Sequence, residues 1–226
     1  NRIRDDFNAV TIDKGVKASS IIDEPYEEER RPNGLIFSQI FNSISGVNRL
    51  NQFIIAEPIT KDLNPAYGSI QKLHARDTDL ITLCEDKCLK ILANKDALFN
   101  ADGNANVTSN QAVLGQSVPF VGEYGISTNP ESFATYGFRA FFADKNRGVV
   151  LRLSRNGLQE ISAQGMSDYF KDKMSTATEI VGSYDDYSNC YNLSFRGDET
   201  VSYKQGLEGW PTRKSFVPEA GVSLNN

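Results

Sequence analysis

The sequence predicts an all-β fold, either a β-propeller-like arrangement or an array of multi-hairpin sheets, with an incomplete propeller as one form and at most one or two short helices. The main observation is a segment type that occurs three times: a strand, a short polar turn and a second strand rich in apolar side chains. These segments span residues 83–92, 140–154 and 182–195. Hairpins that recur along a chain are typical of β-sheet arrays and propeller blades.

The spacing of acidic residues at the strand ends is the second observation. Asp144 and Asp185 occupy equivalent places in their segments and lie 41 residues apart, close to the roughly 40–45 residues of a propeller blade. The earlier interval, from Asp86 to Asp144, is 58 residues. Any repeat in this part of the chain must therefore carry an insertion.

The N-terminal part of the chain differs in composition from the rest. Residues 1–34 show little apolar periodicity, and residues 23–32 form a charge run bounded by prolines. Such a segment is typical of an extended charged arm or linker, which either crosses a neighbour or lies in solvent. Residues 35–226 are predicted to form the β-rich body. The chain begins without Met and ends without a helix stop or a charged tail, and we expect the body to be part of a longer chain.

Alternating or continuous apolar runs separated by turn residues predict the strands of the body. The predicted strands start at Gly34 and then cover residues 52–56, 69–75, 80–84 and 200–203. Turns are expected at residues 42–46, 94–96 and 206–209, and residues 101–135 are expected to interrupt the repetition.

One helix is predicted, over residues 165–174. Ser167 is the expected N-cap, and Met166, Tyr169, Phe170 and Met174 are spaced to share one face.

Composition excludes several classes of protein. Apolar residues make up 39% of the chain and charged residues 23%, which is ordinary for a globular protein. The net charge of −5 is spread over interspersed acids and bases, so no nucleic-acid-binding surface is expected. No apolar run approaches the roughly 18 residues of a membrane helix, and no signal peptide is recognisable.

The three cysteines, Cys84, Cys88 and Cys190, cannot all pair with one another. We predict that they are small apolar side chains within strands of a protein made in a reducing cytoplasm. A disulfide between Cys84 and Cys88 is the alternative. Zinc is disfavoured because His74 is the only histidine and no second cysteine pair exists. No metal or cofactor is therefore expected.

No set of residues predicts catalysis. Asp185 and Asp186 are neighbours, whereas the two carboxylates of a glycosidase must face each other at about 5 to 9.5 Å. We predict instead that Asp185 ends a strand and braces the following turn through Asn189. A Ser–His–acid mechanism would depend wholly on His74, which has no nucleophile motif nearby. The expected protein is not an enzyme and has no catalytic, cofactor-binding or metal-binding residues.

Two short motifs are better explained as turns or loops. Arg196-Gly197-Asp198 matches an adhesion tripeptide, but it joins two apolar strands, and glycine followed by aspartate suits a tight hairpin turn. Residues 102–106 imitate the start of an EF-hand loop. Val107 stands where that loop needs glycine, and Val113 stands where it needs a bidentate glutamate, so a loop without an ion is expected.

From about Asp5 to its end, the chain resembles a family of tailed-bacteriophage virion proteins described as stabilisation, tail-hub or nozzle-like structural proteins. The resemblance rests on short phrases that cover nearly the whole chain. These phrases lie at residues 16–18, 24–28, 45–48, 51–53, 67–72, 94–97, 122–127, 129–134, 144–148, 151–154, 182–185, 209–210 and 214–216.

The resemblance implies a non-enzymatic component of a phage tail or virion, which forms or stabilises a ring near the portal and tail channel. Its implied partners are other tail or portal-proximal proteins and further copies of itself. Genome DNA would pass without specific binding, and no membrane insertion is implied. The protein would be made in the bacterial host cytoplasm and be located in the virion tail. The alternative function is a glycan-binding or glycan-cleaving propeller domain that acts on the host surface.

Overall fold

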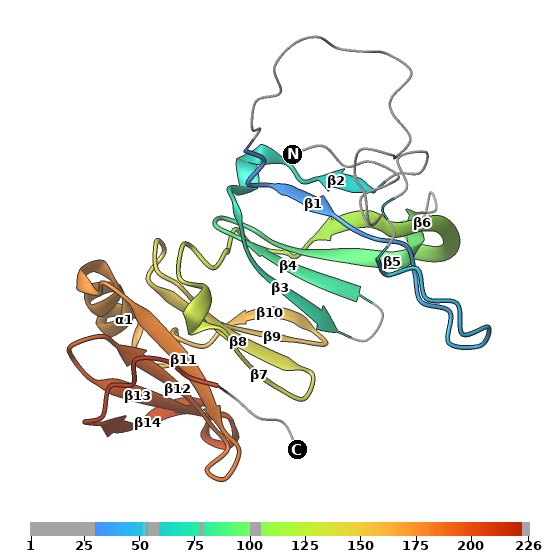
Figure 1. Cartoon of the computed structure of the whole chain (residues 1–226). Coiled ribbons are helices and arrows are strands. Elements are labelled where there is room, and N and C mark those ends of the chain that lie inside the picture. The colour runs from blue at the N-terminus through green and yellow to red at the C-terminus, as the bar shows by residue number, and fades with distance from the viewer. Residues whose placement is uncertain (1–29, 52, 54–58, 77–78, 100–104, 223–226) are drawn as a thin grey trace, which may run out of the picture.

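The fold is all-β, as the sequence predicts. The computed structural model describes residues 30–51, 53, 59–76, 79–99 and 105–222. These residues form four small antiparallel sheets and a single α-helix (Figure 1). The strands are β1 (Gly34–Ile36), β2 (Thr60–Asp62), β3 (Ile70–Arg76), β4 (Asp79–Cys84), β5 (Cys88–Phe99), β6 (Ala105–Pro119), β7 (Ala134–Tyr136), β8 (Arg139–Asp144), β9 (Val149–Ser154), β10 (Gly157–Glu160), β11 (Ile180–Asp185), β12 (Cys190–Phe195), β13 (Thr200–Lys204) and β14 (Gly209–Lys214).

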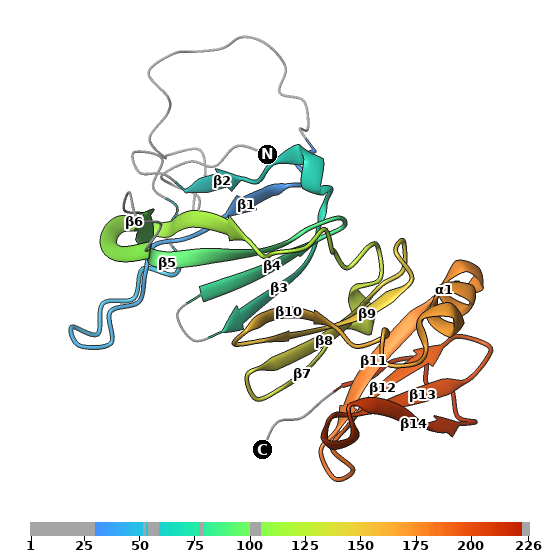
Figure 2. The same cartoon turned by 180° about the vertical axis from the view of Figure 1, so that it is seen from behind.

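Three of the sheets have the same topology. The first sheet contains β3–β6, the second sheet β7–β10 and the third sheet β11–β14, and in each of them strands that follow one another in the chain are neighbours. Strands β1 and β2 form a two-stranded N-terminal ribbon. The three larger sheets follow one another as an open fan, and α1 (Ser167–Thr176) packs against the core between the second and third sheets (Figures 1 and 2).

The second sheet is covered on both faces. Because side chains alternate along a strand, Phe141 on β8 points toward the third sheet and Phe142 points toward the first. On β9, Val150 points toward the third sheet and Leu151 points toward the first. All four side chains are completely buried. Because both faces are buried, the sequences of β8 and β9 are nearly continuous apolar runs rather than alternating apolar and polar residues.

Aromatic side chains fill the space between the second and third sheets. Phe141 stacks on Tyr191 at 5.0 Å between ring centroids and on Tyr184 at 5.6 Å. Tyr136 stacks on the same Tyr184 ring at 4.4 Å. Trp210 on β14 adds a hydrogen bond from its indole nitrogen to the carbonyl oxygen of Ile161, 3.0 Å away. The interface is therefore held by large apolar surfaces and by directed polar contacts.

The outer face of the first sheet is covered by the N-terminal ribbon. Cys84, Leu89 and Ile91 of the sheet pack against Leu63, and Leu35 of β1 lies against the same cluster. The backbone contributes as well, because Pro32 accepts a hydrogen bond from the amide of Ile70 at 2.9 Å. Residues close to the end of the predicted arm are thus bonded to the body.

Two glycines allow consecutive sheets to come into close contact. A Cβ atom on Gly125 would lie 2.0 Å from the carbonyl oxygen of Glu85, in the β4–β5 turn of the first sheet. A Cβ atom on Gly182 would lie 1.9 Å from the carbonyl oxygen of Ser132, just before the second sheet. Real side chains cannot occupy such positions without moving the backbone. Both sheet–sheet contacts therefore require glycine.

Several predicted elements are confirmed. Strand β1 begins at Gly34, residues 70–76 and 79–84 are strands, and the predicted helix exists as α1, with Phe170 and Met174 buried. Ser167 is the first residue of this helix rather than its cap: Met166 holds the cap position and makes no side-chain capping bond. The predicted strand at residues 52–56 falls mostly outside the described residues.

Two other expectations are wrong. Strand β5 continues through the turn expected at residues 94–96. Strand β6 pairs with β5 over part of the segment, residues 101–135, that was expected to interrupt the repetition.

The supposed equivalence of Asp144 and Asp185 is also wrong. Asp144 ends the second strand of its sheet, whereas Asp185 ends the first strand of the next sheet.

Candidate functional site

The three cysteines are free and buried, and no disulfide joins Cys84 to Cys88. Burial raises the pKa of the Cys84 thiol to about 11, and it also raises the pKa of Cys88. Thiols that stay protonated near neutral pH are poor nucleophiles and poor metal ligands. The prediction that these cysteines are apolar side chains within the sheets is confirmed.

His74 lies on β3 at the edge of the first sheet. Its ring is 5.3 Å from the ring of Phe133. Burial lowers the pKa of His74, and the positive charges of Arg76 and Lys72 lower it further. Among the described residues, no three His, Cys, Asp or Glu side chains come together in a way that could hold a metal ion.

Asp185 ends a strand and braces the next turn, as predicted, but through different residues. Its carboxylate accepts hydrogen bonds from the amides of Tyr187 at 3.1 Å and Ser188 at 3.2 Å. Hydrogen bonds from Ser188 lower the pKa of the Asp185 carboxyl. Asn189, the expected partner, instead supplies the left-handed backbone conformation of the turn, with φ of 52°.

Residues 196–198 form a tight turn, which confirms the prediction. Gly197 has a φ of +80°, and the amide of Asp198 donates to the carbonyl oxygen of Phe195 at 3.0 Å. Lys173 pairs with the Asp198 carboxylate, and Arg196 pairs with Glu179. The charged side chains of the tripeptide are thus bound within the chain itself. The loop at residues 102–106 lies mostly outside the described residues.

A buried carboxylate joins the first two sheets, and its sequence context did not reveal this role. Asp144 is fully buried and accepts hydrogen bonds from the amide of Gly125 at 3.0 Å and the hydroxyl of Ser127 at 2.8 Å. The Arg147 guanidinium lies 3.0 Å from Asp144 and 3.3 Å from Asp86 in the first sheet. These bonds join the loop before the second sheet, strand β8 and the β4–β5 turn, so the cluster links the first two sheets.

An exposed apolar loop is the first candidate for an interaction site. Residues 37–51, which we call the apolar finger, extend from β1 and project away from the sheets (the blue loop in Figures 1 and 2). Its tip is ordered by the side chain of Asn42, which accepts hydrogen bonds from the amides of Ile44 and Ser45. A bridge between Phe41 and Asn48 closes the loop. The predicted turn at residues 42–46 is therefore confirmed.

The apolar finger presents large side chains to solvent. Ile44 at the tip is 98% exposed, and Phe41 and Leu50 are each more than half exposed. Ile40 and Val47 are 47% and 45% exposed. Isolated apolar residues on a surface need no explanation, but several gathered on one projecting loop mark a site of contact with another molecule.

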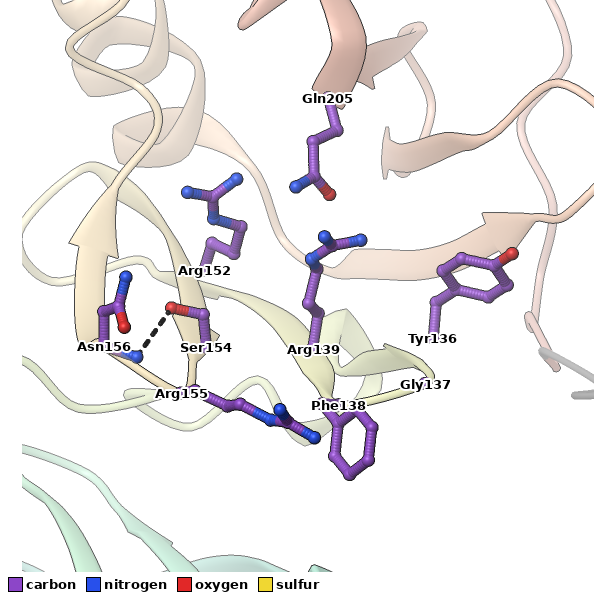
Figure 3. A pocket seen from close by; sticks show the side chains of 9 residues that line it. All are labelled: Tyr136, Gly137, Phe138, Arg139, Arg152, Ser154, Arg155, Asn156 and Gln205. Carbon is purple, nitrogen blue, oxygen red and sulfur yellow. Dashed lines mark hydrogen bonds between the residues drawn. The ribbon is translucent and has the colours of Figure 1, made fainter.

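An arginine-lined cleft between the second and third sheets is the second candidate. We call it the arginine cleft; its volume is about 620 Å³ (Figure 3). Its lining residues are Tyr136, Gly137, Phe138, Arg139, Arg152, Ser154, Arg155, Asn156 and Gln205.

The position of the arginine cleft follows from the strand register. Phe141 on β8 is paired with Arg152 on β9, so both side chains point toward the third sheet. Arg139, two residues before Phe141, lies on the same face. Arg139 and Arg152 therefore lie at the edge of the aromatic core. Figure 3 shows both of them reaching toward Gln205, which comes from the third sheet.

The arginines of the cleft lack acidic partners. Arg152 donates to the side-chain oxygen of Gln159, and the guanidinium of Arg155 lies 4.0 Å from the centre of the Phe138 ring. Within the described part of the chain, no carboxylate forms a salt bridge with Arg139, Arg152 or Arg155. Three arginines and no acidic residue therefore line this cleft, in a protein whose net charge is negative.

One signal in the sequence marks this cleft. Arg152 interrupts the apolar run of β9 at a position whose neighbours on both sides are buried. A charged residue inside such a run has either an internal partner or a functional reason. The sequence cannot show which of these applies, because the absence of a carboxylate partner depends on tertiary contacts.

No protein-family model matches the chain, and no curated protein matches its sequence. Function must therefore be inferred from the residues and their contacts.

Proposed function

We propose that the chain is a non-enzymatic structural component of a bacteriophage tail or virion, which forms or stabilises a ring near the portal and tail channel. The apolar finger is the observation that carries this proposal. Ile44, Phe41 and Leu50 expose apolar surface that a neighbouring subunit can cover. The short sequence phrases shared with phage virion proteins suggest the phage tail as the biological setting. The partners of the chain in this proposal are other copies of itself and portal-proximal tail proteins.

The rigidity of the sheets also supports this role. The second sheet is buried on both faces, and Asp144, Arg147 and Asp86 tie it to the first sheet. A channel wall has to resist deformation while DNA passes, and close-packed layers with buried polar links resist deformation well. The net charge of −5 disfavours adhesion of the passing DNA.

Replacing apolar residues of the finger by acids tests this assembly role. We expect the wild-type protein to form a ring-shaped oligomer and the double variant Ile44→Asp/Leu50→Asp to be mainly monomeric, because a buried unpaired carboxylate disrupts an apolar contact. The matched control is Val121→Asp/Leu207→Asp, which adds the same charge at exposed apolar residues outside the finger (94% and 65% exposed). Light scattering after size-exclusion chromatography and negative-stain electron microscopy measure the oligomer.

The results separate assembly from folding. Circular dichroism should give the same β-rich spectrum for all three proteins. A wild-type protein that stays monomeric at every concentration, or a finger variant that keeps the wild-type oligomer, contradicts the proposal.

The arginine cleft favours a second candidate function, glycan binding at the host surface. Tyr136 and Phe138 provide aromatic surface, and Ser154, Asn156 and Gln205 provide hydrogen-bonding groups. No carboxylate is among the residues that line this cleft, so it lacks the paired acids of a glycosidase. We therefore expect binding without cleavage. Release of reducing sugar from host-surface glycans by purified protein would contradict both candidates.

A further inference from the structure

We propose that the arginine cleft binds a sugar-sized organic molecule that carries an oxyanion, either a phosphate or a carboxylate. The inference deepens the second candidate function, glycan binding in this cleft. It is independent of the tail role, because the cleft lies between the second and third sheets and the apolar finger extends from the N-terminal ribbon (Figures 1 and 3).

The first argument is the charge of the cleft. Arg139 and Arg152 project from neighbouring strands on the same face of the second sheet, and Arg155 lies at the mouth. A fourth arginine, Arg76 of the first sheet, reaches the carbonyl oxygen of Ser154 at 3.3 Å. Like charges that line one cleft repel one another, and a bound anion offsets this repulsion. Because no carboxylate of the described residues pairs with the three lining arginines, an external oxyanion is the chemically matched partner.

The second argument is hydrogen bonding that the protein does not satisfy by itself. The Nε atom of Arg152 and the Oε1 atom of Gln205 are both buried without a hydrogen-bond partner. Buried polar atoms normally have partners, and such exceptions indicate a missing ligand, water or ion. Rotation of the Gln205 amide exchanges its oxygen and nitrogen atoms, so this side chain can present donors to an anion as well as an acceptor to a hydroxyl group.

The third argument is fixed geometry at the mouth of the cleft. The guanidinium of Arg155 lies 4.0 Å from the centre of the Phe138 ring, and this cation–π contact favours one position of the side chain. Tyr136 is held by its stack on Tyr184. Groups that are already ordered lose little conformational entropy when a ligand binds. The mouth of the cleft is therefore organised before the ligand arrives.

The size and chemistry of the cleft favour a sugar that carries the oxyanion. A volume of about 620 Å³ is far larger than a bare phosphate requires and lies within the usual range for small-molecule sites. Ser154, Asn156 and Gln205 offer neutral hydrogen-bonding groups around the arginines, which suits hydroxyl groups next to a charge. Binding to a nucleic-acid backbone would instead need cations spread along a track.

Isothermal titration calorimetry tests the proposal with four probes: glucose 6-phosphate, glucuronate, uncharged glucose and inorganic phosphate. We expect one or both of the acidic sugars to bind at least about tenfold more tightly than glucose and than phosphate alone, because only they use the arginines and the neutral groups together. The comparison between glucose 6-phosphate and glucuronate shows whether the oxyanion is a phosphate or a carboxylate. Added salt should weaken the binding.

Charge-matched variants locate the site. The double variant Arg139→Gln/Arg152→Gln should lower the affinity for the acidic sugar by at least about tenfold, whereas Arg196→Gln/Arg213→Gln should leave it unchanged. The control pair removes the same charge, and both of its residues are exposed and outside the cleft. Thermal unfolding shows whether each variant is folded. If the cleft variant is unfolded, the exposed Arg155→Gln is the replacement, and the same loss of affinity is expected.

Three results would overturn the proposal: glucose binds as tightly as its charged derivatives, inorganic phosphate alone accounts for the full affinity, or the control variant loses as much affinity as the cleft variant. Tight binding of double-stranded DNA that is lost in the cleft variant would also overturn it, in favour of a polyanion surface. A failure here leaves the oligomer of the finger experiment unaffected, so the two proposals fail separately.

Discussion

The hydroxyl group of Tyr191 donates a hydrogen bond of 2.6 Å to the carbonyl oxygen of Ser132. Tyr191 lies in the third sheet, and Ser132 belongs to the short turn that precedes the second sheet. The residues are 59 positions apart in the chain, and both are completely buried. This contact ties the two sheets together beside Gly182, where the backbones are too close to leave room for a Cβ atom.

Changing Tyr191→Phe tests the contribution of this bond. The variant keeps the ring that stacks on Phe141 but leaves the buried carbonyl oxygen of Ser132 without its partner. We expect the free energy of unfolding to fall by about 1–3 kcal/mol. Urea denaturation measures it, with Tyr187→Phe as the control, since Tyr187 is 98% exposed. Equal stability of the two variants would show that the bond contributes nothing.

Changing Asp144→Asn tests the buried cluster between the first two sheets. The variant removes the charge that pairs with Arg147, although Arg147 keeps its contact with Asp86. We expect a loss of about 3 kcal/mol, at the lower end for breaking a buried ion pair. The exposed Asp186→Asn variant is the control and should change stability by less than about 0.5 kcal/mol. An unchanged midpoint of urea unfolding for Asp144→Asn would contradict the structural role.

The cysteines predict a pH dependence of stability. Burial raises the pKa of Cys84 from 9.0 to about 11, so the folded protein holds this proton more tightly than the unfolded chain does. The contribution to stability is complete below about pH 9 and is lost as the pH rises through about 11. Unfolding measured at several pH values should show this decline, and Cys84→Ala should make it shallower without abolishing it, because burial raises the pKa of Cys88 as well.

The same burial predicts that all three thiols are protected in the native protein. Cys84, Cys88 and Cys190 should react with a thiol reagent at pH 8 only after denaturation. Rapid labelling of the native protein at one position would show that its surroundings open readily.

Removal of the N-terminal arm tests whether it takes part in assembly. Ile21, Ile22 and Tyr26 are the expected anchors on a neighbouring subunit. Because Pro32 and Asn33 accept hydrogen bonds from the body, the deletion should stop at residue 29. We expect the truncated protein to stay folded and to form a weaker oligomer, as measured by light scattering at matched concentrations. An identical oligomer would exclude an assembly role for the arm.

The sequence predicts the fold class because hairpins are local. Each strand–turn–strand segment shows its own apolar pattern and its own turn residues, so the all-β class and the turn at residues 196–198 could be predicted without tertiary information. The same local character explains the error over Asp144 and Asp185. The sequence pattern of a hairpin is the same whichever two neighbouring strands of a sheet it joins. Only the strand order of the sheets shows that these two acids are not equivalent.

The candidate sites depend more strongly on tertiary structure. Asp144 and Asp185 both follow a strand and precede a turn, but the first is buried against Arg147 and the second braces its own turn. Arg152 stands out in the sequence as a charge within an apolar strand. Strand pairing within the second sheet places Arg139 near it. Gln205 joins them only because the third sheet packs on the second, and spacing along the chain does not encode this packing.

The two-sided burial of the second sheet also has a consequence for synthesis of the chain. Translation proceeds from the N-terminus, so Phe141 and Val150 leave the ribosome before the third-sheet residues that cover them. Until β13 has emerged, one face of the second sheet is an exposed apolar surface on the nascent chain. We expect this interval to be the time of greatest risk of aggregation, and chaperone binding should peak there.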